Sequence, residues 1–156
     1  HLAKEGLDYR DDATNRDRRF LRNRIRHELL PLLEQDYNPN IKATLTQLAQ
    51  LSQSDYSYLQ HAAQRQWRRV VKALPSRRIA ILVDAFLRQP QALQRQMVRR
   101  AIQDLRGEVG RFEFRHWLEA EQLFLARPVG TLVHLPGGVQ LRREKERVIC
   151  QLIPTA

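Results

Sequence analysis

The chain has 156 residues, of which 42% are hydrophobic and 28% are charged, a composition typical of a folded globular protein. Lys and Arg outnumber Asp and Glu by 27 to 17, and the formal net charge of +10 indicates a polyanionic partner. A single cysteine excludes an internal disulfide and favours a reducing, cytoplasmic location. The longest apolar run, residues 79–83, is far shorter than the ~18 residues of a membrane span, so no membrane partner is expected.

The excess of positive charge lies in the middle of the chain. Residues 61–115 carry 13 basic and four acidic side chains, and 12 of the basic ones are Arg. The planar guanidinium group can bind a phosphate through two parallel hydrogen bonds. This region therefore favours nucleic acid as a partner, with a merely solubilising surface as the alternative. The chain begins with His1 and its only methionine is Met97, so we expect a fragment of a longer protein.

The first predicted helix covers residues 15–30, with Thr14 as its cap. Apolar residues recur on one face, which we expect to be packed: Leu21, Ile25, Leu29 and Leu32. Pro31 is expected to end or kink this helix.

A second helix is predicted to restart at Asn38, with Pro39 in its first position. Residues 40–74 contain neither Pro nor Gly, which predicts one long helix that Pro75 ends. A bend is expected in the polar stretch Ser52–Ser57.

The second half of the chain combines helices with short strands. Residues 79–83 predict a strand, a helical stretch runs from Asp84 or Gln89 to Leu105 and ends at Gly107, and another helix covers 113–126. Three short antiparallel strands follow, at 131–135, 139–143 and 147–153, with turns at 136–138 and 144–146. The predicted class is α+β, mainly helical with a small C-terminal antiparallel sheet.

Three sets of basic residues share helical faces. On the first helix, polar side chains lie beside the apolar face: Arg19, Arg22, Asn23 and Arg26. They suit a phosphate or a base edge, or they pair with Asp11, Asp12 and Asp17. On the long helix, residues 59–74 place a basic stripe opposite an apolar face: Arg65, Arg68, Arg69 and Lys72. Arg95, Arg99 and Arg106 form a second stripe on the later helix. Both stripes can follow an RNA backbone, or they are solvated surface.

Other reactive side chains have more ordinary interpretations. Trp67 and Trp117 fall on predicted apolar faces, which favours the core over base stacking. His27 and His116 have no nucleophile or metal-ligand partner at a suitable spacing, so surface or capping roles are expected and no metal site is predicted. Cys150 lies in an apolar strand and is expected to be an inert core thiol.

The segment from Asp11 to Leu33 resembles a signature of the tRNA(Ile)-lysidine synthetases. The pattern is an acidic-Asp-Ser/Thr-Asn start, then Arg-Asn-x-Ile-Arg, then Leu-Pro-x-Leu. Ten positions meet it: Asp12, Thr14, Asn15, Arg22, Asn23, Ile25, Arg26, Leu30, Pro31 and Leu33. Weaker matches follow in the same order as in that family, at Leu93, Arg95, Arg99 and Arg100, and at the Leu-Pro-Gly-Gly turn of residues 135–138.

The resemblance implies an ATP-dependent ligase that joins the ε-amine of lysine to the wobble cytidine of the isoleucine tRNA with a CAU anticodon. The cytidine is first adenylylated, and lysine then displaces AMP. The family's Ser-Gly-Gly-x-Asp-Ser loop does not occur in this sequence, whose only Gly-Gly pair, Gly137-Gly138, is expected in a turn. ATP and Mg²⁺ are therefore expected to bind mainly outside these residues.

The resemblance also implies an organisation and a set of roles. Residues 1–36 would be the tail of the catalytic domain, 37–76 a connecting helix and 77–156 a tRNA-binding domain. Residues expected to face the catalytic cleft or its substrate are Arg22, Asn23, Arg26, Asn15 and Arg19. RNA contacts are expected from Arg65, Arg68, Arg69, Lys72, Arg95 and Arg99. The alternative is a non-catalytic helical RNA-binding module or scaffold.

Overall fold

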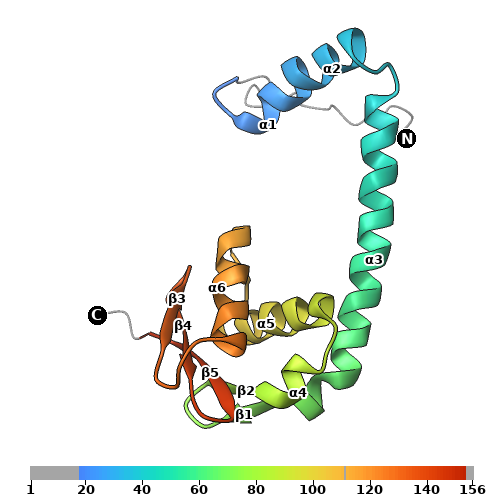
Figure 1. Cartoon of the computed structure of the whole chain (residues 1–156). Helices are drawn as coiled ribbons and strands as arrows, with labels where there is room; N and C mark the ends of the chain where they lie inside the picture. Colours follow the sequence, from blue (N-terminus) through green and yellow to red (C-terminus); the bar gives the residue numbers. More distant parts are fainter. Residues whose placement is uncertain (1–17, 111, 154–156) are drawn as a thin grey trace, which may run out of the picture. The chain divides into compact units, whose positions relative to one another are not determined.

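The computed structural model describes residues 18–110 and 112–153 (Figure 1). The chain divides into two compact units, residues 1–53 and residues 54–156, and the boundary falls within one long helix, α3 (Ile41–Val70). The described residues are mainly helical, with a five-stranded antiparallel sheet, which confirms the predicted α+β class. Among the helices of these two ranges, none combines the length and the apolar character that a membrane span requires.

The first unit contains a helical segment that passes through Pro31. α1 (Leu21–Arg24), a π-helical turn (Ile25–Leu29) and α2 (Leu30–Asp36) follow one another directly. Pro31 therefore does not end the helix, and it lies in the first turn of α2. The Leu30 N–H donates to the Ile25 carbonyl, five residues back, so the hydrogen-bond register changes just before the proline, which has no N–H to donate. The expected cap Thr14 and the start of the predicted helix at residue 15 lie outside the described residues.

The start of α3 differs slightly from the prediction. Ile41 is the first helical residue, so Pro39 lies in the preceding turn and not in the first helical position. Asn38 still has a capping role, because its Oδ1 accepts a hydrogen bond from the Asn40 N–H at 2.9 Å. The helix then continues through Ser52–Ser57, where a bend was expected.

The end of α3 corrects the prediction that a helix reaches Pro75. α3 ends at Val70, and β1 (Val71–Leu74) pairs with β2 (Arg78–Leu82) as an antiparallel hairpin. Val70 and Val71 are both buried, and β-branched residues favour strands when a neighbouring strand is available. Helical periodicity within 59–74 could not reveal this pairing, because periodicity considers one segment by itself and the pairing depends on a second strand.

The sheet belongs to the second unit and is larger than the sequence indicates. β3 (Leu132–Leu135), β4 (Val139–Arg143) and β5 (Arg147–Leu152) confirm the three predicted C-terminal strands. The β1–β2 hairpin adds two more, in the order β1-β2-β5-β4-β3. Ile79 and Leu141 both lie opposite Cys150, so their side chains share one face of the sheet. That face is the hydrophobic core.

Three helices pack on the core face of the sheet: α4 (Val83–Leu87), α5 (Gln91–Arg106) and α6 (Phe114–Leu125) (Figure 1). The helical stretch expected from Asp84 is divided at Pro90, which precedes α5. Gly107 ends α5 in the left-handed conformation, with φ of 86°, as its position predicted. Phe86 of α4 stacks on Phe124 of α6, with ring centroids 3.9 Å apart. The helices thereby cover one face of the sheet.

The remaining core predictions are confirmed. Trp67 and Trp117 are half-buried and pack against the core. Cys150 is fully buried, and its apolar surroundings raise the pKa of the thiol to about 12, so it remains protonated and unreactive at neutral pH.

Candidate nucleic-acid interface

The motif helix of the first unit exposes its arginines and buries its asparagine. Arg19, Arg22 and Arg26 are exposed, whereas Asn23 is only 5% exposed. The guanidinium of Arg22 lies 5.4 Å from the centroid of the Phe20 ring, a cation–π distance. Arg22 and Arg26 are thus exposed to an anionic ligand, and Asn23 has a packing environment. Asn15, with Asp11, Asp12 and Asp17, lies outside the described residues.

The apolar side of the same helix is not packed as predicted. Leu21 is 63% exposed, and Ile25, Leu29 and Leu32 are also exposed. Together with Arg24 and Glu28 they line a shallow hollow of about 310 Å³. The error has a physical reason: periodicity identifies which side chains are apolar and share a face, but not what covers that face.

The C-terminal turns of α3 carry an exposed basic surface, which we call the α3 ridge: Arg65, Arg68 and Arg69. Ala62, Ala63 and Val70 are buried on the other side of the helix. Within the described part of the chain, no carboxylate lies within ion-pair distance of the three arginines. Lys72, predicted on the same helical face, instead lies on β1, where its Nζ donates to the Arg68 carbonyl at 2.9 Å. The ridge therefore has positive charge that the described residues do not neutralise with an ion pair.

The arginines of α5 do not form a uniform stripe. Arg95 pairs with Glu121 at 3.1 Å, Arg100 with Asp104 at 3.7 Å, and Arg106 with Glu108 at 3.4 Å. Arg99 is different, because no ion pair to it occurs among residues 18–110 and 112–153. Its guanidinium lies 5.6 Å from the centroid of the Tyr56 ring. Three of the four α5 arginines are thus paired with carboxylates, and Arg99 has no ion-pair partner among the described residues.

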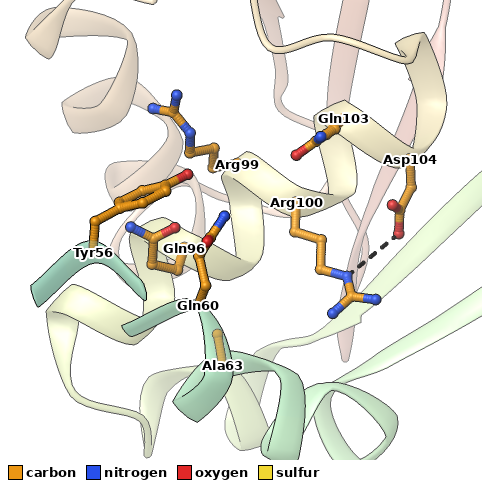
Figure 2. Close-up of a pocket in the computed structure, with 8 residues that line it drawn as sticks. All are labelled: Tyr56, Gln60, Ala63, Gln96, Arg99, Arg100, Gln103 and Asp104. Atoms are coloured by element: carbon orange, nitrogen blue, oxygen red, sulfur yellow. Dashed lines mark ion pairs between the residues drawn. The ribbon is translucent and has the colours of Figure 1, made fainter. Parts of the chain in front are cut away.

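Arg99 faces a cavity of about 270 Å³ between α3 and α5, within the second unit (Figure 2). The lining from α3 is Tyr56, Gln60 and Ala63, and the lining from α5 is Gln96, Arg99, Arg100, Gln103 and Asp104. Sequence reasoning included Arg99 but missed the three glutamines and Tyr56. Only the packing of α5 beside α3 brings them together, and no local pattern in the sequence signals it.

A second cluster missed by sequence reasoning lies at the turn between β4 and β5. Glu144 accepts hydrogen bonds from Arg142 at 2.7 Å and from Arg147 at 2.6 Å. The hydrogen bond from Arg147 and the positive charges of Arg147, Arg142 and Arg78 lower the pKa of the Glu144 carboxyl. Burial opposes this shift to a smaller extent. The available signal was the arginine-acid alternation around the predicted turn, which indicates charge pairing across a hairpin.

The histidines have the modest roles that were expected. His27 is exposed, and the Nδ1 of His116 accepts a hydrogen bond from the Glu113 N–H at 3.0 Å at the start of α6. This contact is half of a capping box, which confirms a capping role for His116.

Two segments of the chain match known protein families. Residues 1–33 match the PP-loop domain, and residues 82–149 match the TilS substrate binding domain. The second match covers the helical layer and the C-terminal strands of the second unit, including α5 with Arg99.

Relatives extend the similarity across nearly the whole chain. A tRNA(Ile)-lysidine synthase of Geobacter sulfurreducens is 33% identical over 148 residues, 95% of this chain and 31% of the relative. That of Nostoc sp. is 34% identical over 139 residues, 82% of this chain and 40% of the relative. That of Solibacter usitatus is 31% identical over 153 residues, 94% of this chain and 33% of the relative. The chain thus spans about a third of the length of these curated relatives, and it is similar to tRNA(Ile)-lysidine synthases over most of its own length.

Proposed function

We propose that the chain is part of an enzyme that uses ATP to ligate lysine to the wobble cytidine of the isoleucine tRNA with a CAU anticodon. The observation that carries the proposal is the match of residues 82–149 to the TilS substrate binding domain, on a folded unit with unbalanced positive charge. The match of residues 1–33 to a PP-loop domain disfavours a non-catalytic module or scaffold. A cytoplasmic location agrees with this role.

In this proposal three consecutive segments of the chain have different roles. Residues 1–36 complete the catalytic domain, residues 37–76 connect it, and residues 77–156 hold the tRNA. Arg22 and Arg26 bind the reacting nucleotide or its phosphates, since both are exposed on the motif helix. Arg19 and Asn15 contribute nearby, and Asn23, being buried, positions the arginines by fixing the backbone of that helix.

The phosphate backbone of the tRNA is bound by exposed or half-buried basic groups. The α3 ridge supplies three of them, and Lys72 and Arg99 add further positive charge. Arg95 contributes less, because its charge is already paired with Glu121, which is only 11% exposed. These contacts hold and orient the tRNA, while the motif helix orients the cytidine.

ATP and Mg²⁺ belong to the catalytic domain in this proposal. Within the described ranges no three His, Cys, Asp or Glu side chains converge as metal ligands. ATP supplies the adenylyl group that activates the cytidine. What this chain supplies is the positioning of that cytidine by guanidinium groups.

The deciding experiment measures transfer of radiolabelled lysine to RNA by the full-length protein. We expect ATP-dependent incorporation into the isoleucine tRNA with a CAU anticodon, and none into the same tRNA with a GAU anticodon. Binding of both tRNAs without incorporation into either would contradict the enzyme and support the non-catalytic module.

A further inference from the structure

The cavity between α3 and α5 has features that holding the tRNA backbone does not require. A surface that follows a phosphate backbone needs only exposed basic side chains, such as those of the α3 ridge. The cavity instead is lined by two half-buried arginines, three glutamine carboxamides and an aromatic ring (Figure 2). This combination of groups is suited to one nucleotide and not to a continuous backbone.

Charge is the first argument. Arg99 is half-buried and lies against Tyr56, and no carboxylate of the described residues pairs with it. Arg100 lies 4.5 Å from the centroid of the Trp67 ring and is paired with Asp104 at the long distance of 3.7 Å. The lining therefore has two positive charges and one negative charge. A partly desolvated cation without a counter-charge is an anion site, and a guanidinium fork suits a phosphate.

The second argument is the set of neutral groups. Gln60, Gln96 and Gln103 each present an amide donor and a carbonyl acceptor, which is the chemistry that reads the edge of a base. Tyr56 adds an aromatic ring of the kind on which unpaired bases stack. Gln96 is half-buried, and Gln60 and Gln103 are exposed, so all three carboxamides are accessible to a ligand.

The size of the cavity limits the occupant. Its volume of about 270 Å³ is slightly below the usual ~300–1,000 Å³ of small-molecule sites. A single nucleotide with an open mouth for the rest of the chain fits this volume better than a base pair. We propose that the cavity binds one unpaired ribonucleotide of the RNA substrate, with its phosphate on Arg99 and its base among the glutamines and Tyr56. This inference rests on the proposed function and adds to it a recognition site for an unpaired base.

The direct test is a titration of the chain with CMP, followed by NMR of the ¹⁵N-labelled side-chain amides. We expect saturable shifts of the carboxamide signals of Gln60, Gln96 and Gln103. Inorganic phosphate should bind at least tenfold more weakly, because it makes only the arginine contacts. Saturation of other signals with these three unchanged would place the nucleotide elsewhere and overturn the inference.

Two variants that change the charge of the lining test the site itself. Arg99→Gln removes the unbalanced positive charge, and Gln103→Glu keeps the size of the side chain while adding a carboxylate that repels phosphate. Both should raise the Kd for CMP at least tenfold. Arg88→Gln is the matched control, because Arg88 is an exposed arginine of the same unit outside the cavity. An equal effect of Arg88→Gln and Arg99→Gln would show a general charge effect and contradict the site.

An RNA arm separates this inference from the function on which it rests. A blunt RNA duplex is compared with the same duplex carrying a short single-stranded extension, and we expect Arg99→Gln to abolish any preference for the extension. Binding of the duplex with no preference and no CMP shift would overturn the cavity site and leave the proposed function intact. CMP binding in the cavity without lysine transfer by the full-length protein would support the cavity site and contradict the proposed function.

Discussion

Arg22 and Arg26 on the motif helix and Arg65 on the α3 ridge are chemically alike, but their surroundings predict different roles. The first two lie on a segment that matches a PP-loop domain, and the third lies on the unit that matches a substrate binding domain at its C-terminal side. A guanidinium that positions a reacting group acts on the rate, whereas one that meets a phosphate acts on affinity.

Substitution of these arginines in the full-length protein should therefore separate rate from affinity. We expect Arg22→Ala or Arg26→Ala to lower the single-turnover rate by roughly 10²–10³-fold, which corresponds to ~2–4 kcal/mol and is typical for a lost transition-state contact. Arg65→Ala should weaken tRNA binding modestly and leave the rate at saturating tRNA nearly unchanged. Matched thermal melts exclude unfolding, and the opposite pattern would show that the roles are reversed.

Glu144 makes the stability of the second unit depend on pH. Its pKa is lowered in the folded state from the ordinary 4.5. It therefore stabilises the fold at pH values above 4.5, and this contribution is lost as pH falls through the folded pKa. Glu144→Gln should accordingly be less stable than the parent chain at neutral pH, with the difference vanishing in strong acid, at about pH 2. Urea unfolding at both pH values measures this, and a constant difference would refute the coupling.

At the scale of elements, the turn between β3 and β4 contacts the end of α5. Gly137 has a φ of 77°, and a Cβ at this position would overlap the guanidinium group of Arg106. The Arg106 side chain also donates to the Val109 carbonyl at 3.3 Å, so it connects the turn to the loop after α5. The Leu-Pro-Gly-Gly sequence thus serves helix-to-sheet packing as well as a tight turn.

A pair of glycine variants separates these two effects. Gly130 has a φ of 91°, and a Cβ added there would meet no atom within 4 Å, so Gly130→Ala measures backbone strain alone. That strain should cost about 1–2 kcal/mol. Gly137→Ala should cost somewhat more than Gly130→Ala, because the Arg106 guanidinium, the end of a flexible side chain, must also move. Chemical denaturation of both variants gives the difference, and equal losses would mean that the Arg106 contact contributes nothing.

At the scale of the whole chain, its interaction with RNA should be strongly salt-dependent. Each phosphate that a basic residue neutralises adds up to about 0.9 to the slope of log affinity against log salt. Replacing all three arginines of the α3 ridge by Gln should therefore reduce the slope by roughly 2–3. Fluorescence anisotropy with a labelled duplex at several salt concentrations measures the slope. An unchanged slope would remove the ridge from the interface.

The local sequence determined much of this protein. The Asp11–Leu33 signature indicated the family, Gly107 marked the end of α5, and the turn residues at 136–138 and 144–146 separated the three C-terminal strands. These features depend on backbone preferences and on the spacing of nearby residues, and both can be read from a short segment of sequence.

Only the tertiary structure decided the features that depend on contacts between elements and on the hydrogen-bond register. Val71–Leu74 became a strand because β2 pairs with it, and Pro31 was accommodated because the π turn shifts the register before it. Arg95 and Arg99 are equivalent in the sequence, yet Glu121 on α6 balances the first and no described carboxylate balances the second. The cavity exists because α5 packs beside α3, a distant segment of the sequence, and such long-range packing has no local periodicity to reveal it.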